Sequence, residues 1–314
     1  MLINTKISSK IVKIPRHDKI ALTHPNKASH NRLALFANHK MMNIFLKPLF
    51  LFFFFLLSSS YVMADNVKEG NRLYEAKKYP EAMTYYLKPD AIKNPRVMNR
   101  IANMYYRGQG VKENQAEAYK WYRRSAEAGL SVAQFNLGLT YEQGKGVQKN
   151  IDEAVKWFKK AAEQYDPDAE MKMGYLTVTG TGIKKDYKQA LHWYQRAAEH
   201  GDVGAYAEIG LFYTLGNGVK KDADRAVQYY IMGAQKGDAR SQAFLGKAYA
   251  LGRGIQQNNE KALQWYTEAA QNGNLNAMKE LSRIYSIGLP GVQKNETESR
   301  YWKDMAEKAE KKQK

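Results

Sequence analysis

The sequence repeats itself every 36 residues, and this period limits the possible folds more than any other feature. An aromatic column recurs at that step, with one residue inserted before its last member: Trp121, Trp157, Trp193, Tyr229, Trp265 and Trp302. A repeat of this length is one supersecondary unit that cannot bury its apolar side chains alone, so neighbouring repeats must stack. We therefore expect a repeat array, although 314 residues would ordinarily suggest two or three globular domains.

A second column and a glycine-rich loop keep the same register. The column reads Tyr105, Tyr141, Thr177, Tyr213, Tyr249 and Tyr285. The loop after it has the pattern Gly-x-Gly-Val/Ile-x-x-Asn/Asp, as in residues 144–150. We expect its first glycine to end one helix and its last residue to cap the next helix. The expected caps are Asn114, Asn150, Asp186, Asp222, Asn258 and Asn295, and a following Glu153, Gln189 or Glu298 should complete a capping box.

Two amphipathic segments lie between successive loops. Their apolar residues recur at helical spacing, in one repeat as Ala133, Leu137, Gly138 and Tyr141, then Ala154, Trp157, Ala161 and Ala162. The pattern predicts an all-α fold, a right-handed α/α solenoid of about six repeats and about fourteen helices whose first helices line a concave face. We place this solenoid at residues 91–311 and a charged tail at residues 312–314.

The matched columns, AxxLGxxYxxGxGVxxN followed by AxxWxxxAAE, resemble the Sel1-like repeat family, which is related to the tetratricopeptide repeats. The resemblance implies a scaffold that binds a protein or peptide ligand and has no cofactor. Residues 65–90 look like a degenerate tetratricopeptide-type helix pair that caps the N-terminal end. Departures are Thr177 in the tyrosine column, Tyr165 where other repeats have glycine, and the last loop, residues 288–291. Some secreted relatives carry a cysteine pair in each repeat, whereas this chain has no cysteine.

An export signal is expected before the repeats. Residues 49–57 read LFLFFFFLL and are preceded by Lys47 and followed by three serines and then by Val62-Met63-Ala64, which has small residues at the −3 and −1 positions. This order is typical of a signal peptide at residues 41–64 that is cleaved after Ala64, which gives a periplasmic or secreted protein. The alternative is an uncleaved anchor, but the apolar run is shorter than the roughly 20 residues of a membrane span. Residues 1–40 are interpreted as a non-native or disordered leader.

The charge of the chain is strongly basic, but much of it lies in the expected leader and signal. Residues 1–64 hold nine of the 49 basic residues and one of the 31 acidic ones, which leaves 40 basic and 30 acidic residues beyond them. Because the two signs are intermixed there, a dedicated nucleic-acid surface is not expected.

No catalytic, cofactor or metal site is predicted, so we do not expect an enzyme. The Gly-x-Gly loops follow helices, whereas a dinucleotide site needs a preceding strand and a third glycine. A few relatives of the family are described as binding or hydrolysing β-lactams, but the chain has no Ser-x-x-Lys motif for serine acylation. An envelope hydrolase for β-lactams or the cell wall therefore remains only as an alternative. His192 and His200 are interpreted as solvent-facing and as helix-terminal side chains.

Two surfaces are candidates for binding a partner. The first is a groove on the first helices, where residues outside the packing stripe vary between repeats: Phe135, Leu139, Met171, Tyr175, Leu211, Phe244, Lys247 and Arg283. The alternative for its apolar members is tighter packing between repeats. The second is a basic ridge in the loops, with Lys149, Lys184, Lys185, Lys220 and Lys221, which either recognises a polyanion or keeps the edge of the solenoid soluble.

Overall fold

The computed structural model describes residues 66–313, which are almost entirely helical. A helix covers residues 66–75, α2 spans Tyr79–Tyr86, and the 3₁₀-helix η1 spans Ala91–Lys93. Within the described range, no helix is long and apolar enough to cross a membrane. The expected leader at 1–40, the signal peptide at 41–64 and its cleavage site lie outside the described residues.

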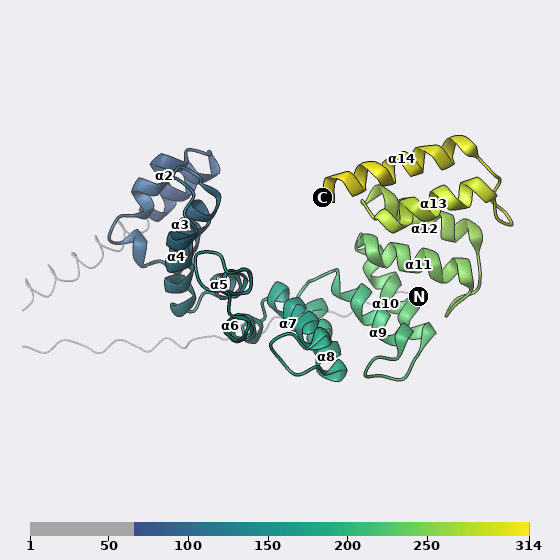
Figure 1. Cartoon of the computed structure of the whole chain (residues 1–314), viewed down its shortest axis with the longest axis horizontal. Helices are drawn as coiled ribbons and strands as arrows, with labels where there is room; N and C mark the ends of the chain where they lie inside the picture. The colour runs from purple at the N-terminus through teal and green to yellow at the C-terminus, as the bar shows by residue number, and fades with distance from the viewer. Residues whose placement is uncertain (1–65, 314) are drawn as a thin grey trace, which may run out of the picture. The chain divides into compact units, whose positions relative to one another are not determined.

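Six helix pairs follow η1, one for each predicted repeat (Figure 1). The first helices are α3 Pro95–Arg107, α5 Ser131–Gln143, α7 Pro167–Thr179, α9 Ala205–Leu215, α11 Ala239–Leu251 and α13 Leu275–Ile287. The second helices are α4 Gln115–Glu127, α6 Ile151–Glu163, α8 Tyr187–Glu199, α10 Ala223–Gln235, α12 Asn259–Gln271 and α14 Glu296–Gln313. Because α14 continues to Gln313, the expected tail is helical as far as the structure describes it.

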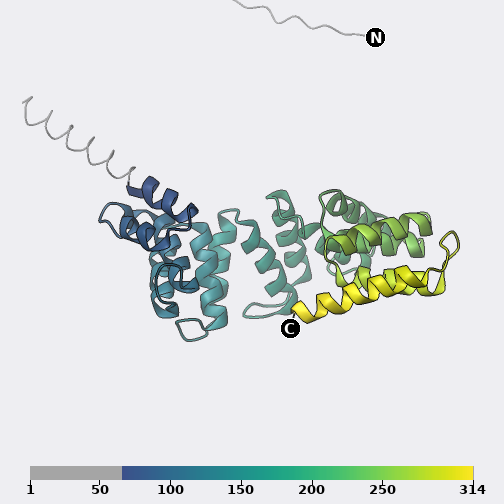
Figure 2. The ribbon, with the colours of Figure 1, turned by 90° about the horizontal axis from the view of Figure 1, so that it is seen from above.

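Each of these helices packs mainly against its neighbours in the chain, an order that can be followed in Figures 1 and 2. Two first helices also meet across a repeat junction, where α9 contacts α11. One buried cluster, which runs from Ala190 to Ala248, draws its side chains from α8, α9, α10 and α11. Buried side chains thus join each repeat to the next, and the prediction of an all-α repeat solenoid is confirmed.

The centre of each inner repeat is an aromatic ring that lies against a glycine of the first helix. Phe158 of α6 is fully buried, and a Cβ atom added to Gly138 of α5 would lie 2.5 Å from its ring. The same arrangement recurs as Gly174 with Tyr194, Gly210 with Tyr230 and Gly246 with Tyr266. The predicted stripe contained Trp157, which is only half-buried. The ring at the centre belongs to the next residue, Phe158. The glycine therefore allows the close approach of an aromatic ring and not of another helix backbone.

The two glycines of each loop have different tasks although they share one backbone conformation. Gly144 and Gly146 both have φ of +72°. Gly144 is the C-cap of α5, as expected. A Cβ atom on Gly146 would overlap the carbonyl group of Gln115, at the start of α4 in the preceding repeat. The equivalent Gly254 lies in the same way on Ala223 of α10, so the second glycine lets each loop stack on the repeat before it.

The predicted caps of the second helices are confirmed, but the capping box is not formed. The Asn150 side chain accepts the Glu153 amide hydrogen at 3.0 Å, and the other five caps make the same bond. The Asn150 amide donates to the Tyr141 carbonyl at 2.9 Å, so it does not need the Glu153 carboxylate. Glu153 instead forms an exposed ion pair with Lys156 at 2.6 Å. The reciprocal bond was therefore predicted wrongly, because a carbonyl at the tyrosine column already accepts from the cap.

Four of the first helices, α3, α7, α11 and α13, also carry side-chain caps, which the sequence analysis did not identify. Asp166 and Asp202 accept the amide hydrogens of Ala169 and Ala205 at 3.2 and 3.0 Å. Burial raises the pKa of both carboxyl groups above its usual value, although these amide bonds act in the opposite direction. Asp166 is the N-cap of α7, and Asp202 bonds to the first residue of α9, so both carboxylates support the start of a first helix at the cost of partial desolvation.

The departures from the repeat pattern are accommodated locally. Thr177 is fully buried, and its hydroxyl donates to the Met173 carbonyl at 2.7 Å. Tyr165 adopts φ of +63°, a left-handed conformation that glycine adopts at the same place in other repeats, such as Gly201. In the last loop, Leu289 and Val292 form an isolated antiparallel bridge.

Candidate functional site

All predicted groove residues lie on first helices, but they differ in how far they reach solvent. Tyr175 on α7 is 54% exposed, and Lys247 on α11 and Arg283 on α13 are exposed as well. The remaining members are half-buried: Phe135, Leu139, Met171, Leu211 and Phe244. The exposed part of the predicted groove is thus one aromatic side chain on α7 and two cations on α11 and α13.

Packing against the core accounts for part of the predicted apolar cluster. The Phe135 ring lies 5.5 Å from the buried Phe158 ring, measured between centroids, and Leu139 borders the same core cluster. Lys172 of α7 bridges to Glu142 of α5 at 2.8 Å, and its ammonium lies 5.7 Å from the Tyr175 ring centroid. For Phe135 the contacts therefore favour the packing alternative, whereas Tyr175 remains available to a partner.

The structure exposes a second set of apolar side chains on the first helices that the sequence analysis did not select. Leu215, Leu251 and Ile287 are the last residues of α9, α11 and α13, and they are 57%, 49% and 60% exposed. They occupy one column of the 36-residue repeat. The signal that could have revealed them is an aliphatic residue directly before the glycine that ends the helix, where helix amphipathicity gives it no buried neighbour.

The five ridge lysines are solvent-exposed, as the soluble-edge interpretation and the polyanion interpretation both require. Lys149, Lys184, Lys185, Lys220 and Lys221 lie in the loops before α6, α8 and α10. The Lys185 ammonium lies 4.7 Å from the centroid of the Tyr187 ring. Over residues 66–313, no carboxylate forms an ion pair with any of the five, so their charge is directed to solvent or to a partner.

A buried carboxylate organises the end of α8. Glu170 of α7 is fully buried, and its oxygens lie 2.7 Å from the Arg196 guanidinium and 2.7 Å from His200 Nδ1. Arg196 also donates to the Ala162 carbonyl at 2.8 Å. His200 therefore has a partner that orients it, contrary to its interpretation as a helix-terminal cation alone. Gln134 and Gln242 occupy the position of Glu170 in other repeats and bond to Gln164 and Asn272, so this cluster is a charged version of a structural contact.

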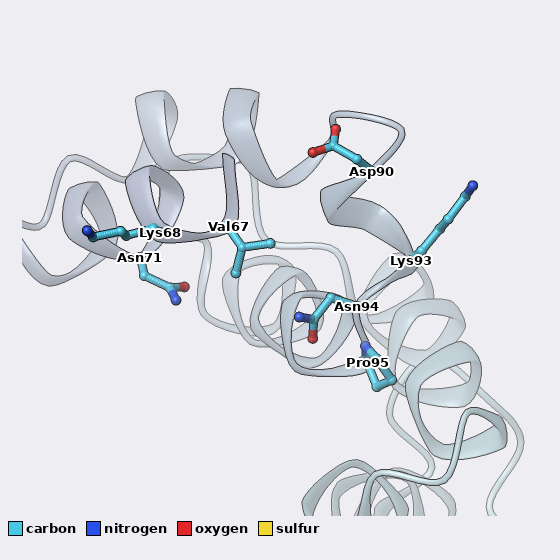
Figure 3. A pocket seen from close by; sticks show the side chains of 7 residues that line it. All are labelled: Val67, Lys68, Asn71, Asp90, Lys93, Asn94 and Pro95. Atoms are coloured by element: carbon cyan, nitrogen blue, oxygen red, sulfur yellow. The ribbon is translucent and has the colours of Figure 1, made fainter. Parts of the chain in front are cut away.

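A hollow of about 570 Å³ lies near the N-terminal end of the described range (Figure 3). Val67, Asn71 and Pro95 line it together with Asp90 and Lys93, whose ammonium extends away from the hollow in Figure 3. The Asn66 amide donates to the Asp90 carboxylate at 2.9 Å, and this bond holds the pKa of that carboxyl below its usual value. The one carboxylate of the lining is thus already bonded, which leaves no convergent acid and base for chemistry.

The remaining candidates for chemistry are clusters of metal ligands and His192. No group of three or more His, Cys, Asp or Glu side chains in residues 66–313 is placed to hold a metal ion. His192 is exposed and lies beside the Trp193 ring, with 6.2 Å between centroids. The exposed features described above are two surfaces, the first-helix face and the loop edge.

Comparison with known proteins identifies the repeat. The profile of the Sel1 repeat matches six consecutive segments, residues 95–130, 131–166, 167–202, 203–238, 239–274 and 275–306. A solved Sel1 repeat protein from Oxalobacter formigenes is 69% identical, with a TM-score of 0.74 over 77% of this chain and 99% of that one. The protective antigen c5321 of uropathogenic Escherichia coli, which displays the same kind of fold, is 28% identical with a TM-score of 0.61; the match covers 78% of this chain and 61% of the antigen. No curated protein matched.

Proposed function

The chain belongs to the Sel1 repeat family, and we propose that it is an exported scaffold that binds another protein through the exposed face of its first helices. Proteins of this family generally serve as interaction scaffolds and not as enzymes. Export is supported by the apolar segment at residues 49–57 and by the small residues Val62 and Ala64 at the −3 and −1 positions. Similarity to a protein described as a protective antigen agrees with a location outside the cytoplasm.

The observation that carries the proposal is the contrast between two columns of the first helices. One column holds glycine in the four inner repeats, where it lies against an aromatic ring, and the small residues Ala102 and Ser282 in the first and last. The other column reads Asn103, Leu139, Tyr175, Leu211, Lys247 and Arg283, and several of its members are exposed. A constant core that presents varied side chains is the arrangement that repeat proteins use for recognition.

The binding part of the proposal is tested by crosslinking the mature chain in the cell envelope and identifying the partner. Tyr175→Glu combined with Leu211→Glu is expected to weaken partner binding at least tenfold, because it places charge within an apolar contact. The matched control reverses the charge of Lys184, Lys185, Lys220 and Lys221. Normal binding by the first variant, with loss in the second, would transfer recognition to the basic ridge. A fall in melting temperature of the first variant would assign both residues to the core.

The export part of the proposal is tested by N-terminal sequencing of the extracytoplasmic protein. Cleavage after Ala64 gives a mature chain that begins at Asp65. Recovery of a soluble extracytoplasmic form that retains residues 1–40 would contradict both the cleavage site and the interpretation of the leader.

Polyanion binding by the ridge is the second candidate function, because the five ridge lysines are exposed and have no carboxylate partner in the described residues. Such binding would depend steeply on salt concentration, since counterions are released from the polyanion. Affinity for heparin as a model polyanion, measured from 50 to 200 mM salt, separates this function from apolar docking.

A further inference from the structure

Leu215, Leu251 and Ile287, here called the aliphatic row, are placed to act together. Each ends a first helix, at the same repeat position in three consecutive repeats. Because packed helices lie about 8–10 Å apart and α9 contacts α11, Leu215 and Leu251 are expected to lie at about that spacing, and the repeat places Ile287 one further step along the row. Arg107, Gln143 and Thr179 occupy the column in the first three repeats, so the row is confined to the last three.

Solvent exposure of the row is not required by the fold. Half or more of each side chain is accessible for Leu215 and Ile287, and nearly half for Leu251. The polar residues of the first three repeats occupy the same place at the end of a helix, so no core contact demands an aliphatic residue there. Exposed apolar side chains that gather on one surface typically mark an interaction site, whereas scattered ones need no explanation.

The charges beside the row are complementary to an acidic partner. Lys247 lies one helical turn before Leu251, and Arg253 follows it by two residues; in the described part of the chain, neither is within ion-pair distance of a carboxylate. The two carboxylates on α9, α11 and α13 are each paired with an arginine. Glu208 pairs with Arg240 at 2.7 Å, and Glu280 pairs with Arg283 at 2.9 Å. Lys247 and Arg253 are thus two cations next to Leu251 that no carboxylate of the first helices neutralises.

We propose that the aliphatic row is a docking site for an acidic amphipathic helix of another protein. This rests on the proposed scaffold function and names its partner chemistry. A partner helix rises about 5.4 Å per turn, so apolar residues at i, i+7 and i+14 recur at about 10.5 Å and match the row. Same-face residues of a β-strand recur at about 6.6–6.8 Å and do not match it. Acidic side chains on the flanks of the helix would meet Lys247 and Arg253.

The test is a selection of binders from a display library of random 18-residue peptides on a helix-favouring framework, with the mature chain as bait. Enriched peptides are expected to carry an excess of Asp and Glu and apolar residues at seven-residue spacing. Their affinity should fall at least tenfold for the variant Leu215→Ser, Leu251→Ser and Ile287→Ser. It should also fall for Lys247→Glu with Arg253→Glu and should weaken as salt is raised.

The control is Met232→Ser, which removes an exposed apolar side chain from the second helix α10 of the fourth repeat and should leave peptide binding unchanged. Melting temperatures of all variants should match that of the unchanged chain, because the replaced side chains are exposed. If the serine variant loses its fold as well as its binding, the variant Lys247→Glu with Arg253→Glu provides the test, since it replaces no apolar side chain.

The remaining outcomes overturn the inference in distinguishable ways. Peptides whose binding depends on Tyr175 and not on the aliphatic row would agree with the scaffold function but refute the aliphatic row as the docking site. Enrichment of basic peptides, or no enrichment from about 10⁹ sequences, would refute an acidic helix as the partner. If no selected peptide depends on a residue of the first helices, the proposed scaffold function is refuted as well. Dimers of the unchanged chain in sedimentation equilibrium that the serine variant abolishes would assign the row to self-association.

Discussion

Replacement of the second loop glycine by alanine tests whether the repeats are joined by close backbone contact. Gly144→Ala and Gly146→Ala start from the same φ of +72°, so both introduce a left-handed alanine at about 1–2 kcal/mol. Only Gly146→Ala also drives a methyl group into the Gln115 carbonyl. The resulting displacement should add about 1–3 kcal/mol, the usual range for overpacking.

We therefore expect Gly144→Ala to lower the free energy of unfolding by about 1–2 kcal/mol and Gly146→Ala to lower it by about 2–5 kcal/mol in all. Urea titrations followed by far-UV circular dichroism measure both, provided that the denaturant slope stays constant. Gly201→Ala, where φ is +103° and nothing lies within 4 Å of the added Cβ, is a further control for strain alone. The reasoning is refuted if Gly146→Ala costs no more than Gly144→Ala.

Three further measurements test the packing and the electrostatics. Trp193→Ala is expected to cost about 3–5 kcal/mol and Trp302→Ala less, because the last repeat has a neighbour on one side only; denaturant melts that reverse this order would contradict nearest-neighbour stacking. Glu170→Ala should cost up to about 3 kcal/mol, since it leaves Arg196 and His200 without their carboxylate, whereas Glu170→Gln with His200→Asn, which copies Gln242 and Asn272, should retain most of the stability. Burial raises the pKa of Asp166 in the folded state, so its contribution is most favourable at acid pH and declines as pH rises from about 4 through the folded pKa. Asp166→Asn should keep the cap, remove this pH dependence of the free energy of unfolding, and be at least as stable as the unchanged chain at pH 7. If the urea midpoint of the variant depends more steeply on pH, the direction assigned to the Asp166 contribution is wrong.

The sequence by itself determined the period, the helix pairs and the ends of the helices. These are local properties, because apolar spacing, left-handed glycines and capping side chains act within a few residues. The same signals recur in each of the six 36-residue repeats. The same logic identified the caps Asn114 to Asn295 and placed every predicted groove residue on a first helix.

Only the tertiary structure decided which side chains the stacking covers. Phe158 and not Trp157 became the centre of its repeat, because the ring that faces Gly138 depends on how two helices are rotated against each other. Glu170 could be recognised as buried only once Arg196 and His200, 26 and 30 residues later, were brought to its oxygens. Leu251 was not selected from the sequence, and its 49% exposure became evident only in the structure, because an aliphatic residue at the end of a helix is compatible with either burial or exposure.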